Sequence, residues 1–322
     1  MPLSLTAAGD DDGRRLDRIL RKALRDVPLS AIHRLLRKGA VLVNGEPAFA
    51  DYHIRSGEII TVPDTVHADT TQNSPRKENA CLAPDAILFE GAGILVLNKA
   101  SGLAVHGKGS LEDLVLSYLE PKLPPSLSFR PGPLHRLDKP SSGIITFSTN
   151  LEGARTFSSL MRERKIKKFY LALIEGRIEN PEIWQDELVR DRQQRRTFTG
   201  LPDDNAKTAL TRVRPLAGNA ASTLILAEIE TGRTHQIRAQ AAARGHPLVG
   251  DRKYGGRPFF QDTSKKDSGG PTAQRGSFLL HAWRMEFPAG TPFPALIEAP
   301  IPNNFPPEIQ TLICRSVTAP IT

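Results

Sequence analysis

The sequence predicts an α+β protein that consists of a small basic N-terminal module and a larger C-terminal domain. Its 322 residues fit about two domains at roughly 100–200 residues each. Residues 64–80 are polar and lack any hydrophobic period, which is typical of a linker. From residue 82 onward, strand-like apolar runs alternate with helical patterns. We therefore expect domains at 14–63 and 82–315, joined by a linker at 64–81.

Two amphipathic helices are expected in the N-terminal module. Leucine and isoleucine recur at helical spacing over residues 16–24, which predicts a first helix with one apolar face. Pro28 interrupts this pattern, and Ser30 is expected to cap a second helix. Gly39 follows the last apolar residue of that helix and should end it.

Short strands should follow the two helices. The apolar run at 41–43 leads into Asn44-Gly45, a pair that favours a tight hairpin turn. The run at 59–62 reads as a closing strand. The module is thus predicted to be a small α+β unit.

Positive charge is concentrated in the same module. The whole chain has 43 Lys and Arg against 35 Asp and Glu, and residues 14–63 alone hold ten of these cations against five acids. A basic surface favours nucleic acid as a partner, because each phosphate contact releases condensed counterions. The cations that the helical patterns leave toward solvent are the candidate RNA contacts: Arg18, Arg21, Lys22, Arg34, Arg37 and Lys38.

The C-terminal domain combines strands with helices. Strands are predicted at 87–89, 94–98, 143–147, 170–174 and 223–229, and helices at 112–119, 151–164 and 234–244. The polar segment 261–276 is expected to be a mobile surface insertion.

Several classes of protein are excluded by what the sequence lacks. Cys81 and Cys314 are the only cysteines, so neither a disulfide framework nor a Cys-x-x-Cys metal site is expected. No apolar run approaches the roughly 18 residues that cross a bilayer, and the N-terminus lacks the features of a secretory signal. We expect a cytoplasmic protein that has no membrane partner.

Motifs of common enzyme classes are incomplete. Gly102 to Lys108 imitates a phosphate-binding loop, but Gly109 stands where the Mg²⁺-binding hydroxyl is required. His135-Arg136-Leu137-Asp138 lacks the contiguous His-Arg-Asp of a kinase loop. The eight histidines have no metal-ligand spacing. These gaps argue against a nucleotide site, a kinase and a metal centre.

Three segments remain that could carry chemistry. Asp138 lies in a polar turn before an apolar strand; a basic run at 162–168 leads into Tyr170; and Thr234 is expected to cap a helix that carries Arg238 one turn in. Each segment alone has an ordinary structural explanation: a turn aspartate, a solvated helix end, or a capped helix.

Taken together, the segments resemble the RluA-type family of pseudouridine synthases, which convert uridine in RNA into its C-glycoside. The resemblance runs through nearly the whole chain. Its motifs are the αL-type RNA-binding module at 14–63, Val96-Leu97-Asn98-Lys99, HRLDKPSSG at 135–143, Lys168-Phe169-Tyr170-Leu171-Ala172, GRTHQIR at 232–238 and Gly245–Asp251.

The resemblance implies a role for each matching residue. Asp138 corresponds to the catalytic aspartate, Tyr170 to the aromatic residue that stacks on the uracil, and Arg238 to the basic residue that pairs with the aspartate. Arg136 corresponds to the arginine that replaces the flipped nucleotide in the stack. The substrate-binding set implied in this way is Arg136, His135, Lys168 and Arg233.

The family's fold has a mixed, mainly antiparallel sheet with flanking helices, and its chemistry needs no cofactor or metal. The N-terminal module is most similar to the branch that modifies large-subunit ribosomal RNA, so we expect that RNA as partner and a monomeric enzyme. Transfer RNA as substrate remains an alternative, as does a catalytically silent RNA-binding protein of ribosome assembly.

Overall fold

The structure is a computed structural model that describes residues 2–24, 26–64, 82–123, 126–191, 193–200, 204–258, 278–303 and 305. Residues 65–81 of the expected linker and the expected insertion at 261–276 lie outside the described residues. The chain divides into two compact units. Unit 1 comprises Met1–Leu82, Leu114–Gly132 and Ser148–Arg155; unit 2 comprises Ala83–Asp113, Pro133–Phe147 and Thr156–Thr322.

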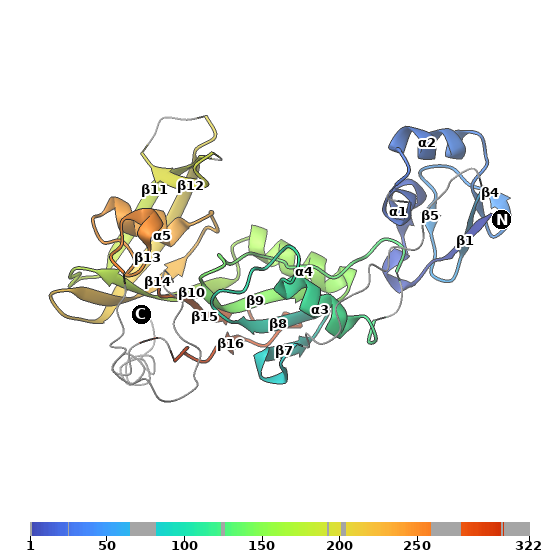
Figure 1. Cartoon of the computed structure of the whole chain (residues 1–322). Coiled ribbons are helices and arrows are strands. Elements are labelled where there is room, and N and C mark those ends of the chain that lie inside the picture. The colour runs from blue at the N-terminus through green and yellow to red at the C-terminus, as the bar shows by residue number, and fades with distance from the viewer. Residues whose placement is uncertain are drawn as a thin grey trace. The chain divides into compact units, whose positions relative to one another are not determined.

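Figure 1 labels the helices and strands. In chain order they are β1 (Leu3–Thr6), η1 (Gly9–Asp11), β2 (Arg14–Arg15), α1 (Leu16–Ala23), α2 (Leu29–Arg37), β3 (Leu42–Val43), β4 (Glu46–Pro47), β5 (His53–Ile54), β6 (Ile59–Val62), η2 (Pro84–Ala86), β7 (Ile87–Gly91), β8 (Ile94–Lys99), α3 (Leu111–Leu119), β9 (Ser142–Ser148), α4 (Leu151–Arg162), β10 (Lys167–Glu175), β11 (Glu182–Asp191), β12 (Arg196–Thr199), β13 (Lys207–Gly218), β14 (Ser222–Ile229), α5 (Gln236–Ala243), η3 (Arg252–Tyr254), β15 (Leu280–Glu286) and β16 (Leu296–Glu298).

The N-terminal module packs two helices against a small sheet. Leu16, Ile19 and Leu20 of α1 are completely buried, as the helical spacing predicts, and Ile32 and Leu36 of α2 join them in one cluster. The sheet has the order β1-β6-β3-β4, and β2 pairs with β5. Strand β1 lies before residue 14 in the sequence and pairs antiparallel with β6, so the sheet draws on residues that precede the expected module.

The boundaries of α2 differ from the prediction at one end. Its N-cap is Pro28, whose carbonyl accepts bonds from the backbone of Ala31 and Ile32. Ser30 therefore lies inside the first turn, and the prediction that it caps the helix is wrong. Proline supplies the extended backbone of the cap position without a capping side chain. At the other end, Gly39 adopts φ 63°, the left-handed conformation expected of a residue that ends a helix.

The predicted hairpin turn is confirmed by its backbone. Asn44 and Gly45 have φ angles of 51° and 90°, and a two-residue turn of this kind requires positive φ at both positions. The turn joins β3 to β4, which pair antiparallel.

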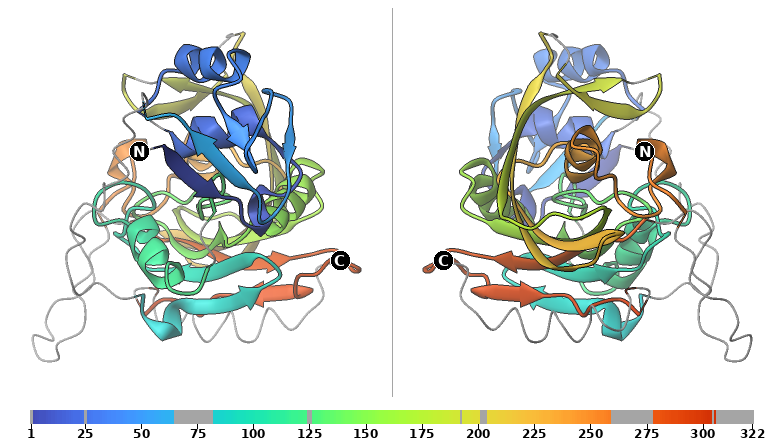
Figure 2. Two further views of the ribbon diagram at one scale, coloured as in Figure 1. Left: turned by 90° about the vertical axis from the view of Figure 1, so that its right-hand side faces the viewer. Right: turned by 90° about the vertical axis from the view of Figure 1, so that its left-hand side faces the viewer.

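Unit 2 is built on one long sheet. Among the described residues, its strands run in the order β12-β11-β13-β14-β10-β15-β9-β8-β7, with β16 paired to β15. Strands β15 and β9 are parallel. The pairs β10–β14, β10–β15, β11–β12, β11–β13, β13–β14, β15–β16 and β7–β8 are antiparallel, which agrees with the expected mixed sheet. In the turned views of Figure 2, the half that carries β11–β13 rises away from the half that carries β7–β9, the twist expected of a long sheet.

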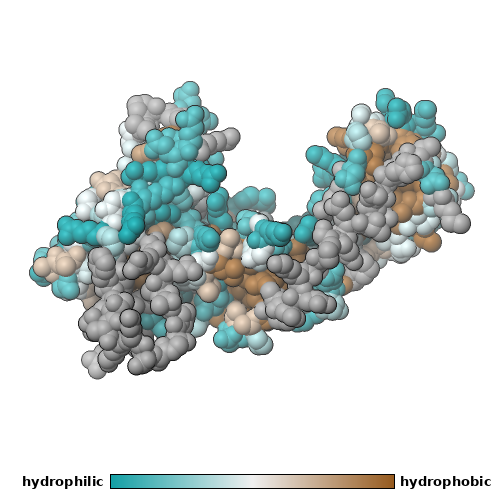
Figure 3. All heavy atoms as spheres, viewed as in Figure 1, coloured by the Kyte–Doolittle hydropathy of each residue, from teal (hydrophilic) through white to brown (hydrophobic). Residues whose placement is uncertain are grey.

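Strands β11, β12, β13, β15 and β16 were not among the predicted strands. Strand β11 explains why, because its sequence EIWQDELVRD buries only Trp184, Leu188 and Val189. Charged side chains alternate with these residues and hide the strand from a search for apolar runs. On the face shown in Figure 3, hydrophilic side chains cover the part of unit 2 that carries β11, β12 and α5.

Glycine is required where β9 meets β15. Gly143 has φ 102°, and a Cβ atom there would lie 2.2 Å from the carbonyl oxygen of Ala282. The parallel register pairs these two residues. Gly143 thus allows a close approach between two strands.

Within the described ranges, no helix has the length and apolar character needed to cross a membrane.

Candidate active site

The loop that carries Asp138 is anchored by a buried lysine at the end of β8. Lys99 is 1% exposed, and its Nζ donates to the carbonyls of Ala100, Leu103 and Lys139 at 2.9–3.1 Å. Burial lowers the pKa of Lys99 to about 8, although the charge of Asp138 opposes the shift. Because Lys139 follows Asp138 directly, this ammonium group fixes the backbone beside the carboxylate.

Arg238, on α5, contacts Asp138 directly. Its Nη1 donates to Oδ2 of Asp138 at 2.7 Å, while its Nε and Nη2 donate to the two carboxylate oxygens of Asp251 at 2.6 and 2.9 Å. The guanidinium is almost fully buried and lies over the rings of Phe278 and Tyr254, at 4.3 and 4.9 Å. Paired with one carboxylate on each side, it holds Asp138 in a fixed position.

The electrostatics of Arg238 follow from the same contacts. Burial lowers the pKa of its guanidinium, but the hydrogen bond and charge of Asp251, and then those of Asp138, outweigh burial and leave the pKa raised. The guanidinium therefore remains charged inside the site.

His235 begins α5 in a left-handed conformation with φ 55°. The predicted cap at Thr234 is wrong, because the N-cap of α5 is His235, whose carbonyl accepts a bond from the backbone of Ala239. Nε2 of His235 lies 3.7 Å from Oδ1 of Asp138, and Nδ1 lies 2.9 Å from the hydroxyl of Tyr254. Burial lowers the pKa of His235 to about 4 against the effect of Asp138, so a neutral ring faces the carboxylate near pH 7.

Tyr170 reaches the same region from the centre of the sheet. The pairing of β10 with β15 shifts register between Phe169 and Tyr170, and such bulges re-aim side chains. Tyr170 is opposite Ala282, which in turn pairs with Gly143, so the tyrosine shares a row with the end of the Asp138 loop. Burial, followed by the charge of Asp138, raises the pKa of Tyr170, and its phenol is neutral.

Similarity to known proteins identifies the family to which this chain belongs. Residues 93–243 match the family described as RNA pseudouridylate synthase, and residues 14–60 match the S4 domain. The "Ribosomal large subunit pseudouridine synthase C" of Salmonella typhimurium (strain LT2) is 33% identical over 309 residues, which cover 95% of each chain. The chain belongs to the RNA pseudouridylate synthase family. The protein of the same name in Escherichia coli (strain K12) is 33% identical over 94% of each chain.

Solved structures agree with this assignment. The chain resembles Human RNA Pseudouridylate Synthase Domain Containing 1 with a TM-score of 0.53 and 25% identity, over 70% of this chain and 86% of the other. Human RNA Pseudouridylate Synthase Domain Containing 4 shares the fold, with a TM-score of 0.54 and 21% identity over 72% and 93% of the two chains.

Asp251 and Lys99 lie in the sequence motifs of this pseudouridylate synthase, but no role was expected for either. Both are central to the geometry of the site. Asp251 is 2% exposed and binds the Nε–Nη2 edge of Arg238, and Lys99 secures the Asp138 loop. A second acceptor such as Asp251 could have been expected, since a buried guanidinium with five donors needs more than one acceptor. His235 is a third such residue, because it approaches the carboxylate of Asp138 from the position directly before α5.

The expected substrate-binding residues occupy different environments. Arg136 is exposed beside the Asp138 loop, whereas Lys168 is buried, and burial lowers its pKa to about 8. Arg233 donates from Nε to the carbonyl of Thr208 at 3.1 Å.

His135 supports the sheet. Its Nε2 accepts the backbone N–H of Thr146 at 3.0 Å, and its ring stacks on Phe157 with a centroid distance of 6.0 Å. Burial, and then the charge of Lys168, lowers its pKa to about 3. These contacts use the ring to position β9, so the structure offers no Nε2 donor to a substrate.

The six candidate RNA contacts of the S4 domain are all exposed. Arg18, Arg21 and Lys22 on α1 line a cavity of about 720 Å³ together with Arg14, Phe129 and Arg130. Arg34, Arg37 and Lys38 lie on or directly after α2. A row of cations beside an aromatic ring suits a nucleic-acid strand, whose phosphates and bases they can bind in turn.

This basic cavity has a firm base inside unit 1. Asp11, fully buried, accepts bonds from the backbone N–H groups of Leu127 and Ser128 at 3.0 and 2.9 Å, and from the hydroxyl groups of Ser126 and Ser128. Arg14 donates to the hydroxyl of Ser128 at 2.8 Å. The segment around residue 128 is thereby fixed against the start of the S4 domain.

Across the described parts of the chain, no group of three or more His, Cys, Asp or Glu side chains is placed to hold a metal ion.

Proposed function

We propose that this pseudouridylate synthase isomerises uridines of large-subunit ribosomal RNA, with Asp138 as its catalytic carboxylate. The observation that carries the proposal is the pairing of Asp138 with Arg238 at 2.7 Å beside the neutral phenol of Tyr170. The names of the relatives from Salmonella typhimurium and Escherichia coli support the choice of ribosomal RNA, as does the S4 domain.

The reaction breaks the C1′–N1 bond, turns the uracil and joins C5 to C1′. The base must first leave its stack, at a cost of a few kcal/mol, and Arg136, exposed beside the loop, is the proposed replacement in the stack. Lys168 is proposed to bind a phosphate of the flipped nucleotide, and Arg233 to bind the phosphate that links this nucleotide to its neighbour. The RNA on either side is held by Arg18, Arg21, Lys22, Arg34, Arg37 and Lys38.

Asp138 then acts on the ribose, by attack at C1′ or by removal of the C2′ proton. Arg238 keeps the carboxylate oriented, so no reorganisation is needed when the bond breaks. Tyr170 stacks on the detached uracil, and stacking of about 1–3 kcal/mol per base retains it while it turns. The C5 proton is released when the new bond is complete.

Tritium release from a large-subunit ribosomal RNA transcript labelled at C5 of uridine tests the proposal. We expect release with the wild type and none with Asp138→Asn, while the variant binds the transcript with unchanged affinity. Asp186→Asn, which also removes a paired carboxylate in unit 2, serves as the matched control and should remain active. Release by Asp138→Asn contradicts the assignment of the carboxylate.

Mapping pseudouridine in a strain that lacks the gene identifies the RNA. Loss of pseudouridine from large-subunit ribosomal RNA, restored by the wild type and not by Asp138→Asn, is the expected result. Loss confined to transfer RNA would overturn the proposed substrate while preserving the reaction.

A further inference from the structure

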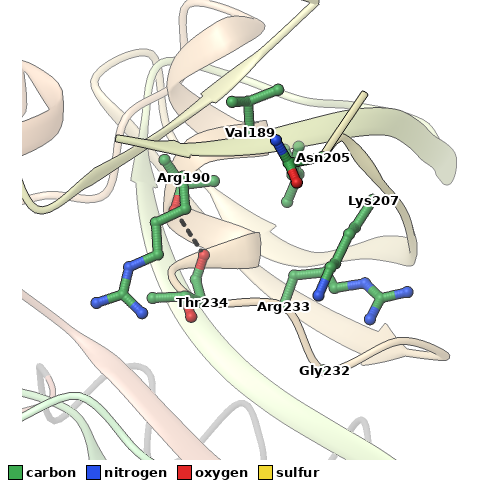
Figure 4. Close-up of a pocket in the computed structure, with 9 residues that line it drawn as sticks. Val189, Arg190, Asn205, Lys207, Gly232, Arg233 and Thr234 are labelled. Atoms are coloured by element: carbon green, nitrogen blue, oxygen red, sulfur yellow. Dashed lines mark hydrogen bonds between the residues drawn. The ribbon is translucent and has the colours of Figure 1, made fainter. Parts of the chain in front are cut away.

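A second cavity lies beside the active site in unit 2. It has a volume of about 550 Å³ and opens among β11, the start of β13 and the segment before α5. Buried Leu188 and Val189 contribute apolar side chains to its lining, and three cations surround it. Figure 4 shows Arg190 on one side, Lys207 and Arg233 on the other, and Thr234 between them.

The wall of this cavity is continuous with the catalytic residues. Thr197 and Thr234 both line it. The hydroxyl of Thr197 donates to the carbonyl of Thr234, and its backbone N–H donates to the hydroxyl of Tyr254 at 2.8 Å. The residue after Thr234 is His235, whose Nε2 lies 3.7 Å from Asp138. The residue that lines the cavity is therefore followed directly in the chain by the histidine whose ring faces the carboxylate of Asp138.

Gly232 brings the cavity close to a further cation. This glycine is part of the lining, and a Cβ atom on it would lie 3.9 Å from Nζ of Lys168. Because Gly232 has no side chain, the buried ammonium group of Lys168 lies directly behind this part of the cavity lining. The cavity is therefore bordered by positive charge on two sides and from behind.

The size and chemistry of the cavity indicate its ligand. Ligand sites of roughly 300–1,000 Å³ are usual for small organic groups, and the lining of this cavity is more polar than apolar. Arginine and lysine at the rim match phosphate oxygens, and the apolar floor accepts the face of a base or ribose. Arg233 is held in direction by its bond to the carbonyl of Thr208 at 3.1 Å, so its guanidinium is prepared for binding.

We infer that this cavity binds a nucleotide of the RNA next to the uridine that is isomerised, with its phosphates held by Arg190, Lys207 and Arg233. The inference rests on the proposed function, and it assigns a role to Arg190 and Lys207 that the family resemblance did not provide. Binding here holds the strand next to the target while the target itself is flipped out to Asp138.

The test compares two double variants in binding and in catalysis. Arg190→Ala/Lys207→Ala removes two rim cations. Arg177→Ala/Arg212→Ala removes two exposed cations of unit 2 that pair with Glu179 and Glu230 instead. Both variants lose the same charge, so a general effect of net charge is common to them.

The probe is an in vitro transcript of large-subunit ribosomal RNA, and its affinity is measured by filter binding over a range of salt concentrations. We expect the rim variant to bind about tenfold more weakly than the control, and its salt slope to fall by roughly 1.4, the value for two phosphate contacts on a single strand. KM should rise by the same factor with kcat within about twofold, because the contact is made in the ground state and the transition state alike.

The outcomes separate this inference from the proposed function. Equal affinity and equal salt slope in the two double variants overturn the nucleotide site, even when the wild type isomerises the transcript normally. Absence of tritium release from the wild type overturns the proposed function, whereas the affinity comparison still reports on the cavity. A rim variant with lower kcat and unchanged KM also overturns the inference, since it places these cations in the chemical step.

Discussion

Asp251 holds the Nε–Nη2 edge of Arg238 through hydrogen bonds of 2.6 and 2.9 Å. The guanidinium is planar, so fixing this edge also fixes Nη1, which donates to Asp138. Asp251 never needs to touch the substrate to control the catalytic carboxylate, because it sets the direction of the group that orients it.

Asp251→Asn should therefore lower kcat by about 100-fold, as expected when a catalytic group is displaced by about 1 Å, with little change in KM. Single-turnover kinetics on the labelled transcript measure the effect. Asp186→Asn is the control, because Asp186 pairs with Arg244, the C-cap residue of the helix that carries Arg238. A normal rate in Asp251→Asn would show that Arg238 needs no second carboxylate.

Lys99→Met should loosen the Asp138 loop. The substitution keeps the length of the side chain but removes three hydrogen bonds to backbone carbonyls. A buried carbonyl that loses its donor costs about 1–3 kcal/mol, so we expect the free energy of unfolding to fall by about 3 kcal/mol and kcat to fall as well.

Urea unfolding and tritium release measure the two effects of Lys99→Met. Lys108→Met, a change at an exposed lysine of the following loop, is the control and should alter neither. Unchanged stability would mean that water replaces the ammonium group at all three carbonyls.

Sequence alone was sufficient for the contacts that depend on regular structure. Arg238 was expected opposite a carboxylate because its position in a helix could be counted, and the hairpin at Asn44-Gly45 follows from backbone preference. Asp251 could not be assigned in this way, because a turn of irregular backbone brings it back to α5. Strand β13 escaped detection for a related reason, since its neighbours in the sheet, and not its own composition, decide which side chains are buried.

Helix starts were the least predictable feature. The caps expected at Ser30 and Thr234 lie at Pro28 and His235 instead. Pro28 occupies the first position because of its fixed φ, and His235 occupies the second because its ring is held by Tyr254 and faces Asp138.

Three histidines, of which His281 is fully buried and His135 and His235 are partly buried, should make unit 2 unstable in acid. Burial lowers the pKa of His135 to about 3, and those of His235 and His281 to about 4. The ordinary value is about 6.5, so below pH 6.5 the unfolded chain takes up protons that the folded chain refuses. Stability is complete above pH 6.5 and is lost as the pH falls toward 4.

Urea unfolding at pH 6.5, 5.5 and 4.5 gives the number of protons taken up, which we expect to be about three near pH 5. His281→Asn should reduce that number by about one. An identical pH dependence in His281→Asn and the wild type would contradict this origin of acid instability.

Asp11→Asn should loosen the segment that borders the basic cavity of unit 1. The amide can accept from one side only, so at least part of the bonding to Leu127 and Ser128 is lost. We expect a decrease of about 2 kcal/mol in stability, typical of a broken hydrogen bond to a charged group. Affinity for the ribosomal RNA transcript should also decrease, because Phe129 and Arg130 lose their fixed position.

Asp12→Asn provides the control for this change. Asp12 is the next residue and is exposed, and its carboxylate binds the backbone of Ser56. Filter binding and thermal unfolding of both variants test the prediction, which fails if Asp11→Asn and Asp12→Asn behave alike.

The position of β15 between β10 and β9 has a consequence for how the enzyme folds during its synthesis. This strand comes from late in the chain, yet it aligns Tyr170 on one side and Gly143 on the other. During translation, the exposed arginines of the S4 domain emerge before β15 does, so the row of Gly143, Ala282 and Tyr170 assembles only after them. A nascent chain therefore presents its S4 domain before this row is formed.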